Sequence, residues 1–209
     1  MVSAKSGRVG RRTTRNGTGS RERILAAAAK LFAENGYHGT GIESISSEVQ
    51  LGRGALYHHI GNKEALLFEI CHSTISDLLR ESEAVLAAGG TCEERFRALM
   101  RVSVRSIADR IPEWTVSLHD FGALTGQRKT IIQQGRDRWE HMIAEVLTEG
   151  AENGDFVALD PIVHKGIIGM FNYTYVWITP GGPLSPEAIA DLFTDTLMSG
   201  VRRPESRDS

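Results

Sequence analysis

The chain has 209 residues, and its 24 Lys and Arg against 26 Asp and Glu give a formal net charge of −2. Residues 1–63 carry a balance of +6 and residues 64–209 one of −8, an asymmetry expected when one end of a protein meets a polyphosphate. Cys71 and Cys92 match no metal-binding or redox spacing, and no apolar run reaches the ~18 residues of a membrane span. With no apolar signal segment at the amino end, we expect a cytoplasmic protein that contacts no membrane and holds no metal or cofactor.

The amino-terminal stretch, residues 1–19, is rich in Gly, Ser and Thr and carries five basic residues between Lys5 and Arg15. Without apolar periodicity it is predicted to be a disordered basic tail, which could add salt-dependent affinity for phosphates. The first helix is predicted from Ser20 to about Asn35, because four apolar residues share one face: Ile24, Ala28, Leu31 and Phe32.

Residues 40–63 predict two short helices joined by a tight turn. Thr40 and Glu43 have the spacing of a capping box at the first helix start. Gly52 is expected to cap the second helix, and Asn62 to cap the long helix that follows. A short helix braced by another one fits the major groove of B-DNA.

The second short helix separates into two faces. Leu56 and Ile60 are expected to pack against the first helix, and one of His58 and His59 is expected to face the core, with His58 favoured as the outward one. An alternative for Tyr57 is a half-buried ring that caps the small core. The residues left for DNA are Arg53, Ala55, Tyr57 and His58.

An ordered set of residues resembles the amino-terminal domain of the TetR family of bacterial one-component repressors. The set comprises Ile24-Leu25-Ala26-Ala27, Leu31-Phe32, Gly36, Thr40, Ile45, Gly54, Leu56-Tyr57-His58-His59 and Asn62-Lys63-Glu64-Ala65-Leu66. The chain departs from the family's usual Ala-Gly-Val-Ser turn, which here is Val49-Gln50-Leu51-Gly52; it also has Ser46 for Ala and Ile60 for Phe. The size class and turn chemistry are preserved.

The resemblance implies a role for each residue of this region. Thr40, Tyr57 and Lys63 would hold the phosphate backbone, and such contacts set register without reading sequence. Lys63 also stands at a helix amino terminus, where the dipole favours an anion. Base edges would be touched by the face containing Arg53, Gly54, Ala55 and His58, with Arg the best bidentate reader of guanine.

The rest of the chain is predicted to be helical, so the fold class is all-α. A long helix from Asn62 to about Ala88 would connect the DNA-binding part to the body. Further helices are predicted over residues 91–110, 112–121 (irregular), 127–152, 160–178 and from 185 onward. We therefore expect a helix-turn-helix domain over residues 20–65 and a ligand-binding and dimerisation domain over residues 66–203.

A small-molecule pocket is implied by the resemblance, since TetR-like bodies usually enclose one. The candidate lining residues are Trp114, Leu118, Phe121, Met142, Phe171 and Tyr175, which could equally be plain core. Residues 171–193 are similar to a TetR subgroup that regulates steroid and fatty-acid catabolism and responds to acyl-CoA thioesters. Arg101 and Arg105, which recur on one helix with Arg95 and Arg97, could bind such phosphates or form a solvated face.

The helix predicted over residues 160–178 is apolar on almost all sides, so one side is expected to meet a partner subunit. The family resemblance implies that the last two helices of each subunit form a four-helix bundle across a two-fold axis. The alternative is that both helices only complete a monomer core. The expected interface residues are Ile167, Phe171, Thr174, Ile178, Ile189, Leu192, Phe193 and Thr196.

Together these features predict a homodimeric TetR-like repressor that a small apolar or acyl-CoA-like effector releases from a palindromic, double-stranded DNA operator. An architectural, sequence-indifferent DNA-binding protein is the alternative, motivated by the basic tail. An enzyme is disfavoured, because the chain has no Gly-rich phosphate loop or nucleophile elbow, and its seven His are scattered.

Overall fold

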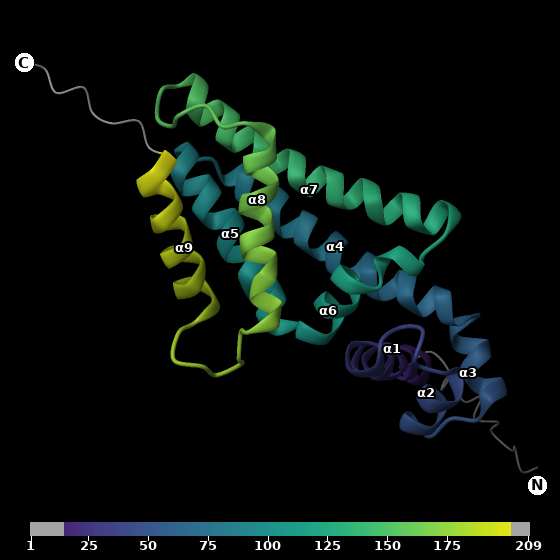
Figure 1. Cartoon of the computed structure of the whole chain (residues 1–209). Helices are drawn as coiled ribbons and strands as arrows, with labels where there is room; N and C mark the ends of the chain where they lie inside the picture. The colour runs from purple at the N-terminus through teal and green to yellow at the C-terminus, as the bar shows by residue number, and fades with distance from the viewer. Residues whose placement is uncertain (1–14, 202–209) are drawn as a thin grey trace, which may run out of the picture.

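The computed structural model describes residues 15–201, with the side chains of residues 15–19, Arg53 and His59 outside the description. The regular elements of this part are helical, which confirms the predicted all-α class (Figure 1). In chain order they are α1 (Arg15–Asn35), α2 (Ile42–Glu48), α3 (Arg53–Ile60), α4 (Lys63–Ala88), α5 (Cys92–Asp109), α6 (Ile111–His119), the 3-10 helix η1 (Phe121–Ala123), α7 (Gly126–Glu152), α8 (Pro161–Asn172), the 3-10 helix η2 (Tyr173–Val176) and α9 (Pro186–Val201). Among them, no helix is both long and apolar enough to cross a membrane.

The head of the molecule consists of α1, α2, α3 and the start of α4, at the lower right of Figure 1. Its core is formed by fully buried side chains, among them Ile24, Phe32, Ile45 and Leu56. Helix α1 begins at Arg15, so the predicted disordered tail is wrong for residues 15–19; residues 1–14 lie outside the described part.

The start of α2 differs from the predicted capping box. Its N-cap is Gly41, and no side chain caps it. The Thr40 hydroxyl instead donates to the backbone carbonyls of Leu31 and Gly36, both at 3.0 Å. These carbonyls lie at the end of α1 and just beyond it, where helix carbonyls lack partners in the next turn. Thr40 therefore fastens the loop to α1 and not to α2.

The turn between α2 and α3 contains a left-handed residue. Gln50 has φ 55°, and it is the only non-glycine with positive φ within residues 15–201. Its N–H donates to the Ser47 carbonyl at 3.2 Å, and the Leu51 N–H donates to Ser46 at 3.1 Å, which closes the turn. Gly52 then caps α3 with extended backbone, as the sequence predicted.

The body is built around α4, which runs from the head into the centre of the molecule (Figure 1). Helices α5, α6 and α7 pack along it, and α9 lies along α5. The caps follow local sequence: Asn62 accepts from the Ala65 N–H at 2.7 Å, and Thr91 forms a capping box with Glu94. Asp160 caps α8 by accepting from the Ile162 N–H at 2.9 Å. Helix α8 ends at Asn172, six residues earlier than predicted, and continues as η2.

Head and body meet at the carboxyl end of α6. The Tyr37 N–H of the head donates to the Asp120 carboxylate at 3.2 Å. Nearby, Glu64 accepts from the backbone N–H and the hydroxyl of Thr125, both at 2.9 Å, and forms an ion pair with Arg128 at 3.3 Å. These bonds lower the pKa of the Glu64 carboxyl.

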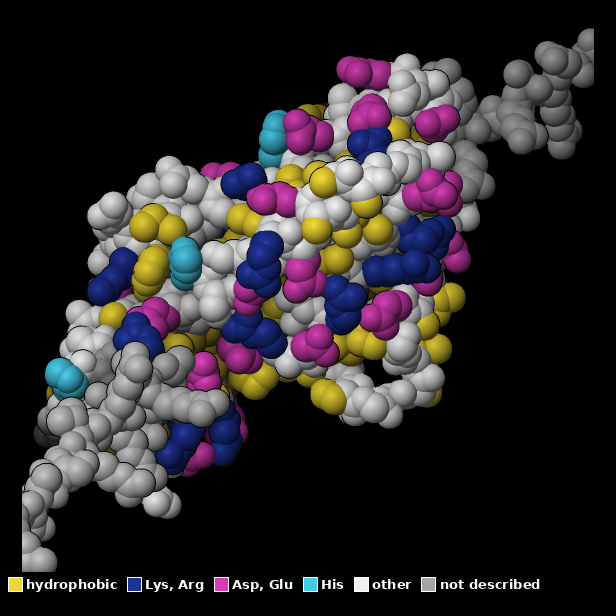
Figure 2. Space-filling view, turned by 180° about the vertical axis from the view of Figure 1, so that it is seen from behind, with side chains coloured by type: hydrophobic (Ala, Val, Ile, Leu, Met, Phe, Trp, Pro, Cys, Tyr) yellow, Lys and Arg dark blue, Asp and Glu magenta, His cyan; other side chains and the backbone are white. Residues whose placement is uncertain are grey.

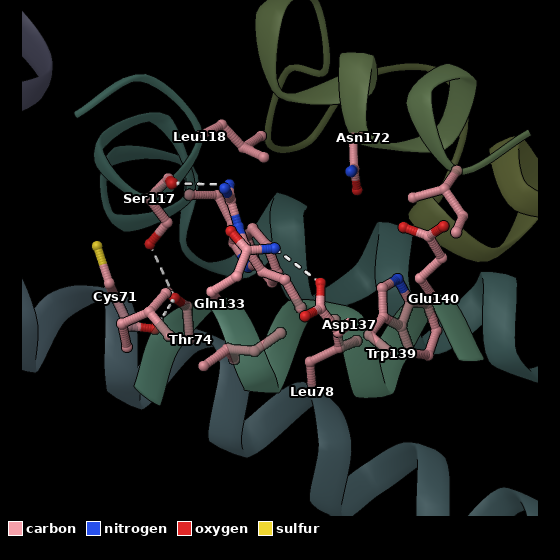
Figure 3. A pocket seen from close by; sticks show the side chains of 15 residues that line it. Cys71, Thr74, Leu78, Ser117, Leu118, Gln133, Asp137, Trp139, Glu140 and Asn172 are labelled. Carbon is pink, nitrogen blue, oxygen red and sulfur yellow. Dashed lines mark hydrogen bonds between the residues drawn. The ribbon is translucent and has the colours of Figure 1, made fainter. Parts of the chain in front are cut away.

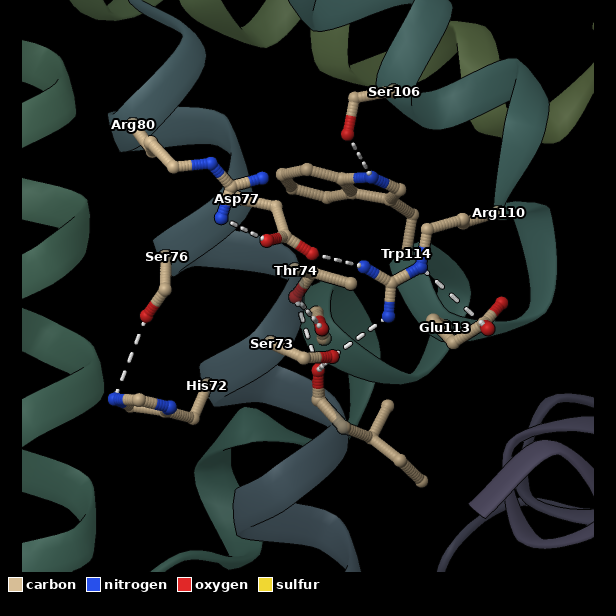
Figure 4. A network of polar contacts seen from close by, with 12 residues as sticks. His72, Ser73, Thr74, Ser76, Asp77, Arg80, Ser106, Arg110, Glu113 and Trp114 are labelled. Atoms are coloured by element: carbon tan, nitrogen blue, oxygen red, sulfur yellow. Dashed lines mark hydrogen bonds and ion pairs between the residues drawn. The ribbon is translucent and has the colours of Figure 1, made fainter. Parts of the chain in front are cut away.

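A second polar network ties α4 to α6 (Figure 4). Arg110 donates to Asp77 at 3.0 Å and to the Ser73 hydroxyl at 2.7 Å, and it lies 3.6 Å from Glu113. The start of α6 is thereby fixed to the middle of α4.

Candidate DNA-reading helix and effector cavity

Helix α3 presents a small, exposed face. Leu56 and Ile60 turn inward and are buried, as predicted. The opposite face is exposed, with 44% of Tyr57 accessible, so part of this ring is open to a DNA partner, and its phosphate contact stays a prediction beside the half-buried alternative. The exposed residues at helical spacing are Gly54, Ala55, Tyr57 and His58. No heavy atom outside the helix lies within 4 Å of a Cβ built on Gly54, so nothing of the described chain covers this face at that point.

The structure describes the side chain of His58 on α3 but not those of His59 and Arg53. His58 is exposed, as predicted, and the side chain of His59 lies outside the described residues. Arg53 opens α3 with its backbone, but its side chain also lies outside the description. Its role as a base reader stays a prediction.

Two of the predicted phosphate contacts have partners inside the head. Thr40 is 2% exposed and its hydroxyl donates to the Leu31 carbonyl of α1, so in this conformation it is not open to a phosphate, and that contact stays a prediction. Lys63 donates to the backbone carbonyls of Tyr37 at 2.7 Å and Thr40 at 2.9 Å, and its ammonium lies 4.2 Å from the centre of the Tyr37 ring. Because an ammonium has three N–H donors, one is left over, and the phosphate contact of Lys63 stays a prediction.

The body contains a cavity of about 220 Å³ between α4, α6, α7 and α8. Figure 3 shows its polar groups, with Asn172 reaching in from α8 and Gln133 and Asp137 standing on α7. Its apolar walls come from the indoles of Trp114 and Trp139 and from aliphatic side chains. The residues that line it are Cys71, Thr74, Ile75, Leu78, Trp114, Ser117, Leu118, Ile132, Gln133, Arg136, Asp137, Trp139, Glu140, Ile168 and Asn172.

Several of the polar groups are already satisfied. The hydroxyls of Thr74 and Ser117 bond to each other at 2.8 Å, and the Trp114 N–H donates to the Ser106 hydroxyl at 3.0 Å (Figures 3 and 4). Burial raises the pKa of the Cys71 thiol to about 11, which makes it an unreactive thiol at neutral pH. These groups shape the cavity and have little capacity left for a ligand.

Arg136 is the basic residue of the cavity lining. One guanidinium nitrogen donates to the Ser117 carbonyl at 3.0 Å, and the group stacks over the Phe121 ring at 4.4 Å. Burial lowers the pKa of this guanidinium, which stays charged at neutral pH. No ion pair joins Arg136 to any acidic residue of the described part of the chain.

Of the residues predicted to line a ligand pocket, Trp114 and Leu118 border this cavity. Phe171 lies in the core instead, with its ring centre 5.6 Å from that of Phe193, because α8 turns this residue toward α5 and α9. The Tyr175 hydroxyl bonds to His119. Neither side chain lines the cavity. Phe121 and Met142 do not line it either: Phe121 lies beneath Arg136, and Met142 is buried elsewhere on α7.

The arginines proposed for ligand phosphates hold helices together. Arg101 forms two bonds of 2.7 Å to Asp191 on α9, and Arg105 pairs with Glu81 on α4 at 2.7 Å. Neither lines this cavity, and both guanidinium groups already have carboxylate partners, so a ligand contact for them stays a prediction. Figure 2 shows basic and acidic side chains lying beside one another over this face of the body, in agreement with pairing between helices.

Arg136 was missed because its surroundings come from four helices. One local signal was available: it stands one turn after Ile132 and one turn before Trp139 and Glu140, within the apolar stripe of α7. An arginine on the buried side of an amphipathic helix is unusual and often has a special partner.

The expected interface residues divide into two groups. Ile167, Phe171, Thr174, Ile178 and Ile189 are buried within the subunit itself, so they belong to its core, and their contact with a partner stays a prediction. Leu192 and Thr196 are exposed, and Phe193 is partly buried. The apolar side chains that α8, η2, α9 and their connection leave exposed are Ile162, Val163, Tyr173, Val176, Trp177, Leu184 and Leu192.

Similarity to known proteins agrees with this architecture. Residues 24–70 match the family described as Bacterial regulatory proteins, tetR family, and residues 89–201 match Tetracyclin repressor-like, C-terminal domain. The chain is 24% identical over 193 residues to the HTH-type transcriptional repressor KstR2 of Rhodococcus jostii strain RHA1, covering 90% of this chain and 94% of that protein.

Two solved structures show the same fold. One is the TetR family transcriptional regulator PfmR from Thermus thermophilus, with TM-score 0.79, 30% identity and coverage of 87% of this chain and 100% of that one. The other is AibR in complex with isovaleryl coenzyme A and operator DNA, with TM-score 0.75, 28% identity and coverage of 85% and 97%. The chain therefore belongs to the TetR family and is a DNA-binding transcriptional regulator, not an enzyme.

Proposed function

We propose that this regulator is a homodimeric repressor that reads a palindromic operator with α3 and leaves it when a small effector occupies the cavity of the body. The observation that carries the proposal is the exposed face of α3, held on a helix-turn-helix whose inward side chains are fully buried. Two such helices related by a two-fold axis match two half-sites one helical turn apart.

Homodimerisation is supported by the apolar surface on α8, η2 and α9. It includes Trp177, 45% exposed, and Leu192, 53% exposed, on neighbouring elements. Large contiguous apolar surface is uncommon on monomers and marks interaction sites. Gly166 and Gly169 lie on the exposed side of α8, and a Cβ at either would meet no heavy atom within 4 Å in the subunit, so a partner helix can approach closely there.

Control by an effector is supported by the cavity and by the contacts at the end of α6. Ser117 borders the cavity, and Asp120, one helical turn later, bonds to Tyr37 of the head. An effector that changes the position of α6 would alter how the head is held. It can shift the equilibrium only by its differential affinity for the two states. The likeness to AibR, solved with isovaleryl coenzyme A, supports a small or acyl-CoA-like effector.

The test of DNA reading begins with a binding site selected from random duplexes by the full-length protein. Affinity for that site and for a scrambled duplex is then compared at one fixed salt concentration. Arg53→Ala should lower affinity for the selected site by roughly 1–3 kcal/mol and leave scrambled DNA little changed, whereas Lys63→Ala should weaken both about equally. An Arg53→Ala variant that keeps full discrimination would contradict the proposed reading face.

The same measurement tests the alternative of an architectural DNA-binding protein, which the basic amino-terminal stretch of the sequence motivates. Such a protein would bind both duplexes equally and show a steep salt dependence. A selected site that is palindromic and preferred by roughly 10³-fold or more would contradict this alternative.

A further inference from the structure

Of the three charged side chains that line the cavity, Arg136 and Asp137 have no ion-pair partner among the described residues, and Arg136 is the one that is half-buried. Glu140 is paired with Lys165 at 2.5 Å, and Asp137, which is exposed to solvent, accepts from the Gln133 amide at 2.7 Å. Arg136 is half-buried and bonds only to a carbonyl and an aromatic face within the described residues. A guanidinium has five N–H donors in a planar fork, so most of its capacity is still open.

The walls around Arg136 limit what can bind. Trp114 presents apolar ring surface because its N–H is already used by Ser106, and Trp139, Ile75 and Leu78 extend that surface. The Asn172 side chain points toward the cavity (Figure 3) and makes no hydrogen bond to any described residue. At about 220 Å³ the cavity lies below the ~300 Å³ of typical drug-sized sites. A compact molecule fits inside it, whereas a coenzyme A thioester would have to extend out of it into solvent.

We propose that the effector is a small organic acid whose carboxylate is held by Arg136, with its apolar body between Trp114 and Trp139. The proposal rests on the proposed function, because it names the chemical class of the effector. A carboxylate matches the guanidinium fork with two parallel hydrogen bonds, and such charge-assisted bonds are the strong ones. The same anion would balance a charge that the fold has partly removed from water.

Binding is tested on the full-length protein without DNA, by titration calorimetry and by tryptophan fluorescence in a Trp177→Phe background, which leaves Trp114 and Trp139 as the emitters. The probes are isovalerate, benzoate and 3-phenylpropanoate, each compared with its uncharged amide, and isovaleryl coenzyme A as the thioester. At least one carboxylate should bind with a Kd below ~1 mM and more tightly than its amide by roughly tenfold or more. If no carboxylate binds, or an amide binds equally well, the proposal is overturned.

Variants then locate the anion. Arg136→Gln should weaken the bound carboxylate by roughly tenfold to a hundredfold, and its amide by much less. Arg136→Lys keeps the charge but loses the planar fork, so its affinity for the carboxylate should lie between those of the wild type and Arg136→Gln. It replaces the Gln variant as the test if that variant does not fold. Arg138→Gln is the matched control, since Arg138 lies on the same helix but pairs with Glu83 at 2.8 Å on the surface. Unchanged carboxylate affinity in both Arg136 variants would overturn the proposal.

Operator release is measured in a separate experiment, so that a failure of the effector-controlled function can be distinguished from a failure of the anion site at Arg136. A carboxylate that binds at Arg136 without releasing DNA would contradict the proposed effector-controlled function and leave the anion site standing. Release by isovaleryl coenzyme A or by the amides, with no binding of the carboxylates, would leave the function standing and overturn the anion site.

Discussion

Leu192 lies on the exposed apolar surface of α8 and α9, so a substitution at this position tests whether the surface forms the dimer interface. This side chain is 53% exposed in the isolated subunit, in contrast to the buried Ile189 one turn before it. Replacement by Asp places a carboxylate on the surface that a partner subunit is expected to cover. We expect Leu192→Asp to give a folded monomer.

The magnitude follows from the exposed fraction and the symmetry. Full burial of a leucine contributes about 2 kcal/mol, so covering the remaining half contributes ~1 kcal/mol. A two-fold interface contains the position twice, which gives ~2 kcal/mol for the dimer. Each unpaired carboxylate buried instead costs at least about 1–3 kcal/mol. A total of ~4 kcal/mol or more weakens dimerisation by about 10³-fold.

Sedimentation velocity across a range of protein concentrations measures this change, and circular dichroism with thermal unfolding checks that the subunit stays folded. Ala84→Asp, which adds the same charge at an exposed position of α4, is the control and should leave the dimer intact. The selected operator should also lose affinity in the Leu192 variant, since each monomer brings only one reading helix. A Leu192→Asp protein with the dimer constant of the wild type would refute the reasoning.

Three further predictions concern stability. Gln50→Gly should raise the free energy of unfolding by up to about 1 kcal/mol, because the left-handed φ of 55° costs a side-chain-bearing residue more than glycine; chemical denaturation measures it. Gly150→Ala should destabilise by about 1–3 kcal/mol and lower the Tm, since the new Cβ would lie 2.2 Å from the Phe156 ring. Glu64 has a folded pKa below its unfolded value of 4.5, so its bonds to Thr125 stabilise the fold above that pH and are lost as the pH falls through the folded pKa. The difference in urea midpoint between wild type and Glu64→Gln should therefore shrink from roughly pH 5 to pH 3.

Features that depend only on neighbouring residues in the chain could be predicted from the sequence. The predicted caps at Gly52 and Asn62 depend on one glycine or one side chain and on backbone within the next turn, and the structure has both. The inward face of α3 was also predictable, because its two large aliphatic residues lie one turn apart.

Contacts whose partner comes from a distant segment could not be predicted. The spacing of Thr40 and Glu43 satisfies a capping box, but the Thr40 hydroxyl reaches α1, which only the folded head brings close. Arg101 has an exposed helical position, and its partner Asp191 is ninety residues away in the chain. In α8 the difficulty has a different cause: an almost wholly apolar helix has no polar side to mark the outside, so periodicity cannot tell that Phe171 faces inward.

A few hydrogen bonds and one ring contact connect the cavity of the body with the head. Arg136 holds the Ser117 carbonyl and the Phe121 ring, which stand on either side of Asp120. Asp120 in turn accepts from Tyr37, whose carbonyl is bound by Lys63 at the start of α4.

If the effector draws the guanidinium toward its own carboxylate, we expect the bond to the Ser117 carbonyl to weaken and the change to reach the head through the bond between Asp120 and Tyr37. Coupling between two such sites is typically 1–3 kcal/mol, or about 5- to 150-fold in operator affinity. By the same linkage the operator must weaken effector binding by that factor. Effector affinity measured with and without operator therefore gives the coupling independently of any release assay. Asp120→Ala, which removes the bond to Tyr37, should change that ratio if the contacts at the end of α6 carry the signal.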